Sequence, residues 1–301
     1  MCGIFGWIKP RNSSGHGLNL DKLTKAGMLE TIPRGRDATG FYTPGHGIVK
    51  DAVIASEFTF PKVGHERLFI GHCRAASIGA AINPLNAHPF DCGDFVVVHN
   101  GTIRGIKPLP EYEYEGDTDS EILTSYIHKY GVKSGIERSG AMGALVIMDT
   151  GTNRIYFWSN DARPMEICRY RGMIFFASTR YILRTALKID KVMGLFDDAN
   201  WYKCGDRELI CFDMRNGVNK FRSIGITKES PPALTVHKTY SYGRGSYTPA
   251  SYTPPKSLGG DGCEIPNWTP PARKSGNRFR SGSINPPAHE DDDGFGTGFN
   301  Y

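Results

Sequence analysis

Six apolar runs of strand length constrain the fold of this chain more than any other feature of its sequence. They lie at residues 67–70, 95–98, 144–148, 154–158, 173–177 and 208–212. The runs are rich in β-branched and aromatic residues and are separated by Gly, Asp and Asn, so we expect buried strands. Helical periodicity is rarer, and is clearest at 18–29 and at 120–127, where Asp117 or Thr118 is a candidate cap. Because strands and helices come in blocks, without strict βαβ alternation, the pattern favours an α+β fold in which two sheets pack together with flanking helices.

Composition excludes several classes of protein. The chain has 301 residues, of which 39% are hydrophobic and 22% charged, as in an ordinary globular protein. It contains no apolar run near the ~20 residues that span a bilayer, and Met1–Gly3 lacks the basic start and apolar centre of a secretory signal. The net charge of +5 is too small to indicate nucleic-acid binding by itself. We therefore expect a cytoplasmic protein without membrane contact.

The cysteines argue against a disulfide framework and against a zinc site. There are seven, an odd number, and no two of them form a C-x-x-C pair: Cys2, Cys73, Cys92, Cys168, Cys204, Cys211 and Cys263. Most are expected to be small buried hydrophobes. The sequence offers no convincing cluster of metal ligands, so we predict no metal and no other cofactor.

Composition changes sharply near residue 229. Ten of the 19 prolines lie at 229–301, together with many Gly, Ser and Tyr residues, and the sequence SYTP at 246–249 recurs at 251–254. Such a segment buries too little apolar surface to offset the entropy of ordering. We therefore predict one domain at 1–228 and a disordered tail at 229–301. The tail carries seven basic and seven acidic residues, so the net positive charge belongs to the domain.

Two stretches of the tail admit a more specific interpretation. Basic and aromatic residues interleave at 273–280, a pattern that suits single-stranded nucleic acid or an acidic partner. The acidic and aromatic end at 290–301 suits a docking peptide. For both stretches a solvated, solubilising tail is the simpler interpretation.

Cys2 is the first residue with an evident chemical use. If an aminopeptidase removes Met1, the thiol and the free α-amine lie on one residue, with pKa values of roughly 8.5 and 7.7–8.0. The amine can then take the thiol proton and later return it to a leaving amine, as in an N-terminal nucleophile hydrolase. On the tripeptide Met1–Gly3 alone, a small residue near a strand start is an equally good interpretation.

Six short motifs occur in an order that resembles a known family. They are MCGIFG at 1–6, RGRDATG at 34–40, GHCRAAS at 71–77, NAHP at 86–89, HNGTI at 99–103 and DTDSE at 117–121. Together they resemble the glutaminase domain of the class II glutamine amidotransferases, which include glucosamine phosphate synthase, amidophosphoribosyltransferase and asparagine synthetase. The resemblance covers roughly residues 1–215. It implies the four-layer αββα fold of N-terminal nucleophile hydrolases, in agreement with the block pattern.

The resemblance assigns the bond-breaking residues. Cys2 is implied to be the nucleophile, and Asn100 with Gly101 the oxyanion hole. Asn100 and Gly101 follow the predicted strand at 95–98, so a turn there would present an amide side chain and an unhindered N–H, and losing one such donor commonly costs ~10²–10³ in rate. In isolation, the pair would be an ordinary Asn-Gly turn.

The resemblance also assigns the residues that bind glutamine. Arg74 is implied to hold the α-carboxylate, for which its planar fork is suited, and Asp119 the α-ammonium. Ser77 and His88 align with residues that line the glutamine pocket. Read alone, Arg74 would form a surface salt bridge and Asp119 would be a helix-capping group.

Neighbouring residues are expected to shape the site. Arg34 and Asp37 match a segment that supports it, and we expect support rather than chemistry from both. The chain departs from several relatives at Ala75, where they carry an aromatic residue, and at Ile78, where some carry histidine. These departures bear on how the site closes and leave the bond-breaking residues unchanged.

The implied activity is hydrolysis of the glutamine side-chain amide through a γ-glutamyl thioester. Only 73 residues follow residue 228, and well-known members fuse the domain to a synthase that consumes the ammonia. We therefore expect a separate protein to accept the ammonia. The alternatives are a stand-alone glutaminase or γ-glutamyl amidase, a peptidase of the same nucleophile class, and a catalytically silent domain that senses glutamine or serves assembly.

Overall fold

The computed structural model describes residues 1–11, 13, 17–160, 163–187, 201–214 and 222–225. The predicted boundary between 228 and 229, and the whole predicted tail, lie outside the described residues. The helices of the described part are α1 (Leu20–Leu29), the 3₁₀ turn η1 (Pro84–Asn86), α2 (Asp119–Tyr130), α3 (Val132–Ser139) and α4 (Arg180–Leu187). None of the helices in these ranges combines the length and the apolarity that crossing a membrane would take.

Two antiparallel sheets make up the centre of the domain. The first has seven strands in the order β11 (Trp201–Lys203), β9 (Glu166–Tyr170), β10 (Met173–Ala177), β1 (Gly3–Ile8), β4 (Leu68–Arg74), β2 (Ala38–Thr43) and β3 (Gly47–Asp51). The second has six strands in the order β13 (Arg222–Gly225), β12 (Glu208–Asp213), β8 (Arg154–Ser159), β7 (Gly143–Asp149), β6 (Phe95–Gly101) and β5 (Phe90–Cys92). Each of the six apolar runs forms part of a strand, as predicted, and of their residues only Arg67 lies outside one.

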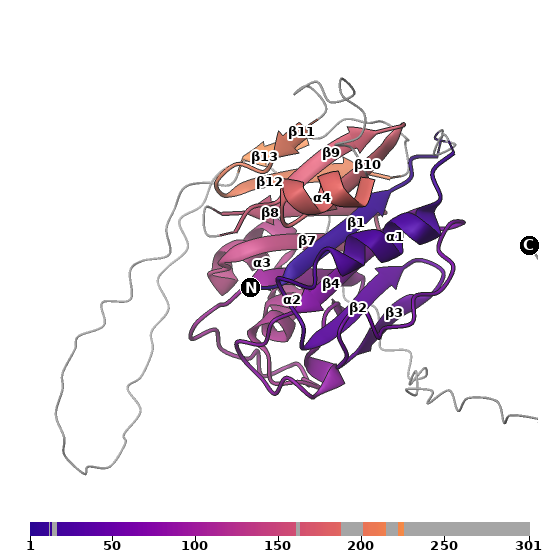
Figure 1. Cartoon of the computed structure of the whole chain (residues 1–301). Coiled ribbons are helices and arrows are strands. Elements are labelled where there is room, and N and C mark those ends of the chain that lie inside the picture. The colour runs from indigo at the N-terminus through magenta and orange to yellow at the C-terminus, as the bar shows by residue number, and fades with distance from the viewer. Residues whose placement is uncertain (12, 14–16, 161–162, 188–200, 215–221, 226–301) are drawn as a thin grey trace, which may run out of the picture. The chain divides into compact units, whose positions relative to one another are not determined.

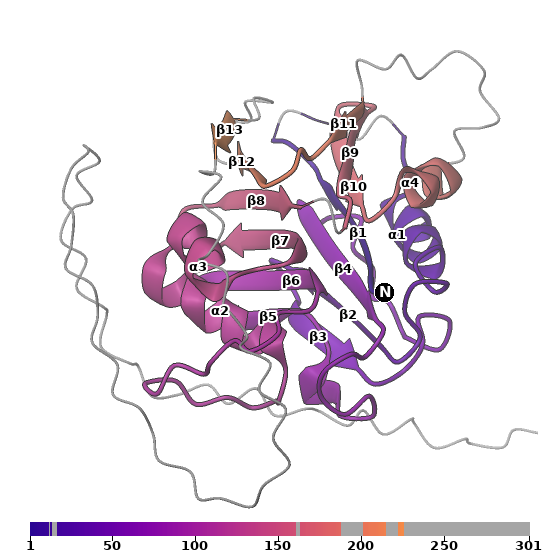
Figure 2. The same cartoon turned by 90° about the vertical axis from the view of Figure 1, so that its left-hand side faces the viewer.

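The sheets face each other between two layers of helices. Helices α1 and α4 cover the outer face of the seven-stranded sheet, and α2 and α3 cover the outer face of the six-stranded sheet (Figures 1 and 2). The predicted four-layer αββα fold is therefore confirmed. Of the two predicted candidates for the N-cap of α2, Asp117 and Thr118, the structure has Thr118. Its hydroxyl accepts a hydrogen bond from the Glu121 N–H.

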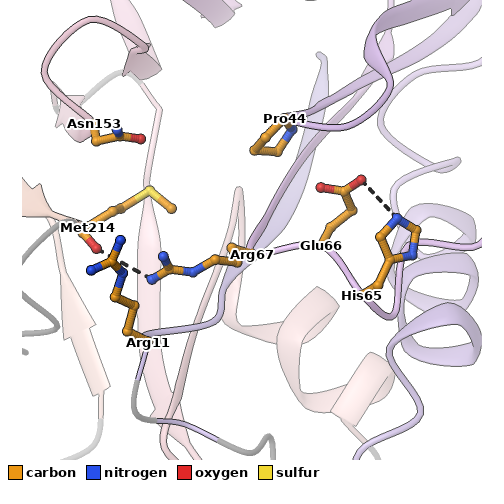
Figure 3. Close-up of a pocket in the computed structure, with 7 residues that line it drawn as sticks. All are labelled: Arg11, Pro44, His65, Glu66, Arg67, Asn153 and Met214. Atoms are coloured by element: carbon orange, nitrogen blue, oxygen red, sulfur yellow. Dashed lines mark hydrogen bonds and ion pairs between the residues drawn. The ribbon is translucent and has the colours of Figure 1, made fainter.

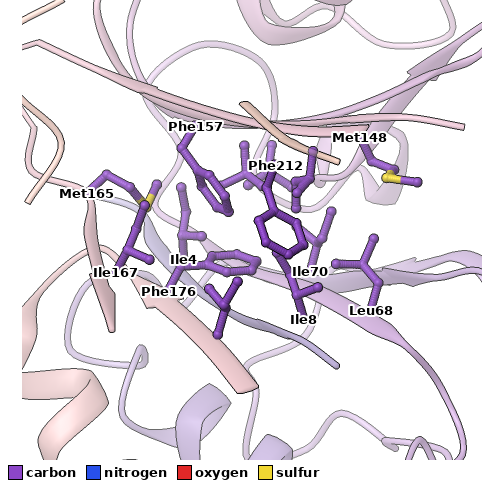
Figure 4. Packing of buried hydrophobic residues seen from close by; sticks show 14 of the residues in the cluster. Ile4, Ile8, Leu68, Ile70, Met148, Phe157, Met165, Ile167, Phe176 and Phe212 are labelled. Carbon is purple, nitrogen blue, oxygen red and sulfur yellow. The ribbon is translucent and has the colours of Figure 1, made fainter. Parts of the chain in front are cut away.

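Three hydrophobic clusters match the three interfaces between these layers. The cluster between the sheets joins Ile4, Ile70 and Phe176 of one sheet to Phe157 and Phe212 of the other, and all five side chains are fully buried (Figure 4). A second cluster lies between the seven-stranded sheet and α1 and α4, and a third between the six-stranded sheet and α2 and α3. Alternate residues of β1 serve two of these interfaces, since Ile4 points to the other sheet while Phe5 packs under α1.

Candidate functional site

One end of the double sheet gathers most of the residues singled out from the sequence. Cys2 directly precedes β1, Arg74 ends β4, Gly101 ends β6, and Asp119 begins α2. A small hollow lies between them, and its lining is Cys2, Arg74, Ala75, Ser77, Ile78, His88, His99, Gly101, Thr118, Asp119 and Ser120. Six of the seven predicted site residues therefore line the same hollow, and Asn100 does not.

The Cys2 thiol is held by the backbone that follows β4. The residue is 8% exposed. The Ala75 N–H donates to Sγ at 3.4 Å, and Sγ lies 3.6 Å from the Ala75 carbonyl. Burial raises the pKa of the Cys2 thiol, although the Ala75 N–H, the chain's terminal ammonium and two arginines oppose the rise. The thiol is therefore mostly protonated near neutral pH, and a nucleophilic thiolate requires a base.

Arg34 and Asp37 support this arrangement from the segment before β2. The Arg34 Nε–H donates to the Cys2 carbonyl oxygen at 2.9 Å. The Asp37 carboxylate accepts a hydrogen bond from the Ala76 N–H at 2.7 Å. The two side chains thus fix the backbone on both sides of the thiol and do not contact Sγ themselves.

Arg74 and Asp119 bring opposite charges to the hollow. The Arg74 guanidinium donates to the carbonyls of Ile78, Gly79 and Ala80 at 2.6, 3.3 and 3.1 Å, which holds the loop after β4 in place. A guanidinium has five N–H donors, so these bonds do not exhaust it. The Asp119 carboxylate accepts from the Ile103 N–H at 2.5 Å through Oδ2, and its second oxygen, Oδ1, accepts a long hydrogen bond from the Ser120 hydroxyl at 3.5 Å.

Ser77 and His88 line the hollow in different ways. Ser77 is exposed, and its hydroxyl lies 3.0 Å from that of Thr102. His88 is 4% exposed, and neither ring nitrogen has a hydrogen-bond partner within the described residues. His88 is therefore an unsatisfied polar group beside the thiol.

The two residues of the predicted oxyanion hole, Asn100 and Gly101, differ in whether they line the hollow. The Asn100 amide nitrogen donates to the Ser178 hydroxyl at 3.5 Å, and the same hydroxyl accepts the Ile4 N–H at 2.9 Å. Asn100 thus connects β6 to β1 next to the thiol, although its side chain does not line the hollow. Gly101 does line it, and a Cβ at Gly101 would lie 1.8 Å from the Met142 carbonyl oxygen, so only glycine fits.

Sequence reasoning singled out His88 but missed two neighbouring histidines, His72 and His99. His72 and His88 stack with ring centroids 4.1 Å apart. His99 lies 2.9 Å from the Ser120 hydroxyl through Nδ1 and 2.9 Å from the Met142 carbonyl through Nε2. The carbonyl only accepts, so Nε2 carries the proton. Each histidine falls inside a quoted motif, but only the fold brings the three motifs together.

We expect acid to destabilise the domain through these histidines. Burial lowers the pKa of His72 to about 3, and lowers those of His88 and His99 as well. Below about pH 6.5 these histidines bind protons in the unfolded chain but stay neutral in the folded domain. The free energy of unfolding therefore falls as the pH falls. Each such histidine contributes a slope of about 1.4 kcal/mol per pH unit below its unfolded pKa. Urea unfolding measured at several pH values between about 7 and 5 gives the slope.

Variants separate this effect from titration elsewhere. His72→Gln should reduce the slope by about one proton, whatever it does to the absolute stability. Val49→Ala removes no ionisable group from an exposed position of β3 and should leave the slope unchanged. An unchanged slope in His72→Gln would show that His72 takes up its proton in the folded domain.

The described residues contain no group of three or more His, Cys, Asp or Glu side chains placed to hold a metal ion. The six cysteines of the described ranges are free thiols. The chemistry that the hollow itself presents is therefore that of one thiol, two opposite charges and hydrogen-bonding groups.

Comparisons with known proteins agree with the motifs. No family model matches the chain. A glutamine–fructose-6-phosphate aminotransferase of Sulfurisphaera tokodaii is 30% identical over 201 residues, which are 59% of this chain and 33% of that protein. The enzyme of the same name from Pyrococcus horikoshii is 29% identical over 202 residues, 59% of this chain and 32% of that protein. The chain thus matches about a third of the length of these relatives.

Solved structures share the fold. A glutamine phosphoribosylpyrophosphate amidotransferase from B. subtilis aligns with a TM-score of 0.52 and 17% identity, over 76% of this chain and 50% of that one. A structure described as the allosteric regulatory enzyme of purine biosynthesis aligns with a TM-score of 0.55, at the same identity and coverage. At this identity the likeness concerns the fold alone.

Proposed function

We propose that this chain hydrolyses the side-chain amide of glutamine. The premise is that its described domain belongs to the class II glutamine amidotransferases. One observation carries the proposal. Six of the seven predicted site residues, Cys2 among them, come from separate segments of the chain and line one hollow. A domain without catalysis would have no physical need for that convergence.

In the proposed reaction, removal of Met1 frees the Cys2 α-amine, which takes the thiol proton. The thiolate attacks the side-chain carbonyl carbon of glutamine, and the carbonyl becomes a tetrahedral oxyanion. The Gly101 N–H and the Asn100 amide, after it turns from Ser178, donate to that oxyanion. The protonated α-amine then gives its proton to the leaving nitrogen. Ammonia departs, and water hydrolyses the γ-glutamyl thioester to glutamate and free thiol.

The two charges suit the remainder of the substrate. Glutamine carries an α-carboxylate and an α-ammonium, and the hollow has Arg74 and Asp119 among its lining residues. The free N–H groups of Arg74 would bind the carboxylate, and the second oxygen of Asp119 the ammonium. Ser77 and His88 would complete the lining. Neither charge is the nucleophile, so both act on binding and orientation.

An electrophilic glutamine analogue tests the proposal. The purified full chain is incubated with an analogue in which an electrophilic carbon replaces the amide, and the labelled peptide is identified by mass spectrometry. We expect one covalent adduct, on a Cys2 that is the first residue of the mature chain. The other cysteines are internal controls. Binding of the analogue without an adduct would support a silent glutamine sensor, and an adduct on another cysteine would contradict the mechanism.

The acceptor of the ammonia is a further part of the proposal. The matched relatives are named as aminotransferases, and about two thirds of their length has no counterpart in the alignment. We place the acceptor site on a separate protein that binds this chain. Glutamine labelled with ¹⁵N in the amide, supplied to the chain with proteins that copurify from its source, should yield a labelled organic product. Label found only as free ammonium would instead indicate a stand-alone glutaminase.

A further inference from the structure

A second cavity of the described domain lies at the opposite end of β4 from the hollow that contains Cys2. It has a volume of about 310 Å³ and is lined by Arg11, Pro44, His65, Glu66, Arg67, Asn153 and Met214 (Figure 3). Arg67 directly precedes β4 and Arg74 ends it, and the seven residues of that strand span about 23 Å. The cavity is therefore separate from the hollow that contains the thiol.

Two arginines dominate its chemistry. The guanidinium groups of Arg11 and Arg67 lie beside each other in Figure 3, and Arg67 donates to the Met214 carbonyl at a long 3.4 Å. Neither arginine has an ion pair with any carboxylate in the described part of the chain. Burial, and then the charge of Arg11, lower the pKa of Arg67. Two adjacent positive charges are thus held together, and no carboxylate of the described residues forms an ion pair with either.

The one carboxylate in the cavity wall is engaged elsewhere. Glu66 is 5% exposed, and its Oε1 lies 3.3 Å from His46 Nδ1 and 3.2 Å from His65 Nε2. Its Oε2 accepts the Gly45 N–H at 3.2 Å. In Figure 3 the carboxylate points towards His65 and away from the guanidinium pair. Glu66 therefore does not neutralise the arginines, and its Oε1 has no hydrogen bond from the described residues.

We propose that this cavity binds a small phosphate monoester, with its phosphate on Arg11 and Arg67. Two planar guanidinium forks match the charge and the oxygen geometry of a phosphate dianion. The Asn153 amide and the His65 ring supply further polar contacts. The volume lies at the lower end of the range for small-molecule sites, and leaves room for a short organic group between Pro44 and Met214.

Calorimetric titration tests the proposal without using glutamine turnover. Glycerol 3-phosphate and inorganic phosphate are titrated into the full-length chain and into its Cys2→Ala variant, at constant ionic strength. We expect saturable binding of one glycerol 3-phosphate per chain, equal in both proteins and at least threefold tighter than that of inorganic phosphate. Equal affinities would assign the cavity to free phosphate, and no saturable binding would overturn the site altogether.

Variants connect the binding to the cavity. Arg67→Gln and Arg11→Gln should each lower the affinity for glycerol 3-phosphate and for inorganic phosphate by about tenfold or more, as expected when a charged hydrogen bond is lost. Lys133→Gln removes an equal charge from the exposed surface of α3 and should change neither affinity. Arg67→Lys keeps the charge without the fork, so intermediate affinity is expected even if Arg67→Gln folds poorly. Unchanged affinity in Arg67→Lys and Arg11→Gln would contradict the proposal.

Discussion

Replacing Cys2 with alanine is expected to lower kcat for glutamine hydrolysis by about 10³-fold or more, because the reaction then has no nucleophile. The fold should survive the change. The Cys2 carbonyl still accepts the Arg34 hydrogen bond, and the substitution removes one sulfur atom. Ammonia release from the purified variant, measured beside urea unfolding, separates the loss of chemistry from a loss of structure.

A second buried thiol provides the matched control. Cys73 lies in β4, opposite Gly3 of β1, and burial raises the pKa of its thiol to about 11. Its side chain packs in the cluster under α1 and α4. Cys73→Ala should therefore cost stability through the cavity it leaves and should preserve kcat within a few fold. Full turnover in Cys2→Ala would remove the thiol from the mechanism, and an active protein that retains Met1 would remove the α-amine.

Local patterns were sufficient to predict six of the 13 strands of the described residues and the two longest helices, α1 and α2. The six apolar runs are rich enough in β-branched and aromatic residues to be predicted as strands. Threonine, as at position 118, is a preferred N-cap residue. Helices α3 and α4 escaped prediction because each has only eight residues. In α3 the decisive feature is packing, since a Cβ at Gly135 would lie 2.6 Å from the Ile127 Cα in α2. Glycine at that position lowers helix propensity but permits the close approach.

The site was predictable as a set of residues and not as a set of contacts. Motif order sufficed to select Cys2, Arg74 and Asp119, and the fold brings them to one hollow. The sequence could not indicate that Arg74 is bound to three loop carbonyls, or that the Asn100 amide donates to the Ser178 hydroxyl. Such partners lie on segments up to 78 residues apart, and no periodicity within one segment encodes them.

Replacing Gly101 with alanine is expected to lower kcat by about 10²–10³-fold through displacement of one oxyanion donor. The added Cβ would lie 1.8 Å from the Met142 carbonyl oxygen and 2.4 Å from His99 Nε2. Backbone must therefore shift where Gly101 pairs with Gly143 of β7. The same shift disturbs the hydrogen bond from His99 to that carbonyl. Since the N–H of residue 101 moves with the backbone, kcat should fall more than KM rises.

Gly64→Ala is the matched control for this substitution. A Cβ there would meet Asp21 Oδ1 at 3.5 Å, an ordinary contact, and the Gly64 N–H bond to the same oxygen is kept. The control should retain kcat. Comparing kcat of the two variants at a temperature where urea unfolding shows both to be folded isolates the effect on the oxyanion site. If Gly101→Ala is folded and turns over glutamine at the wild-type rate, the tetrahedral oxyanion is not stabilised at this end of β6.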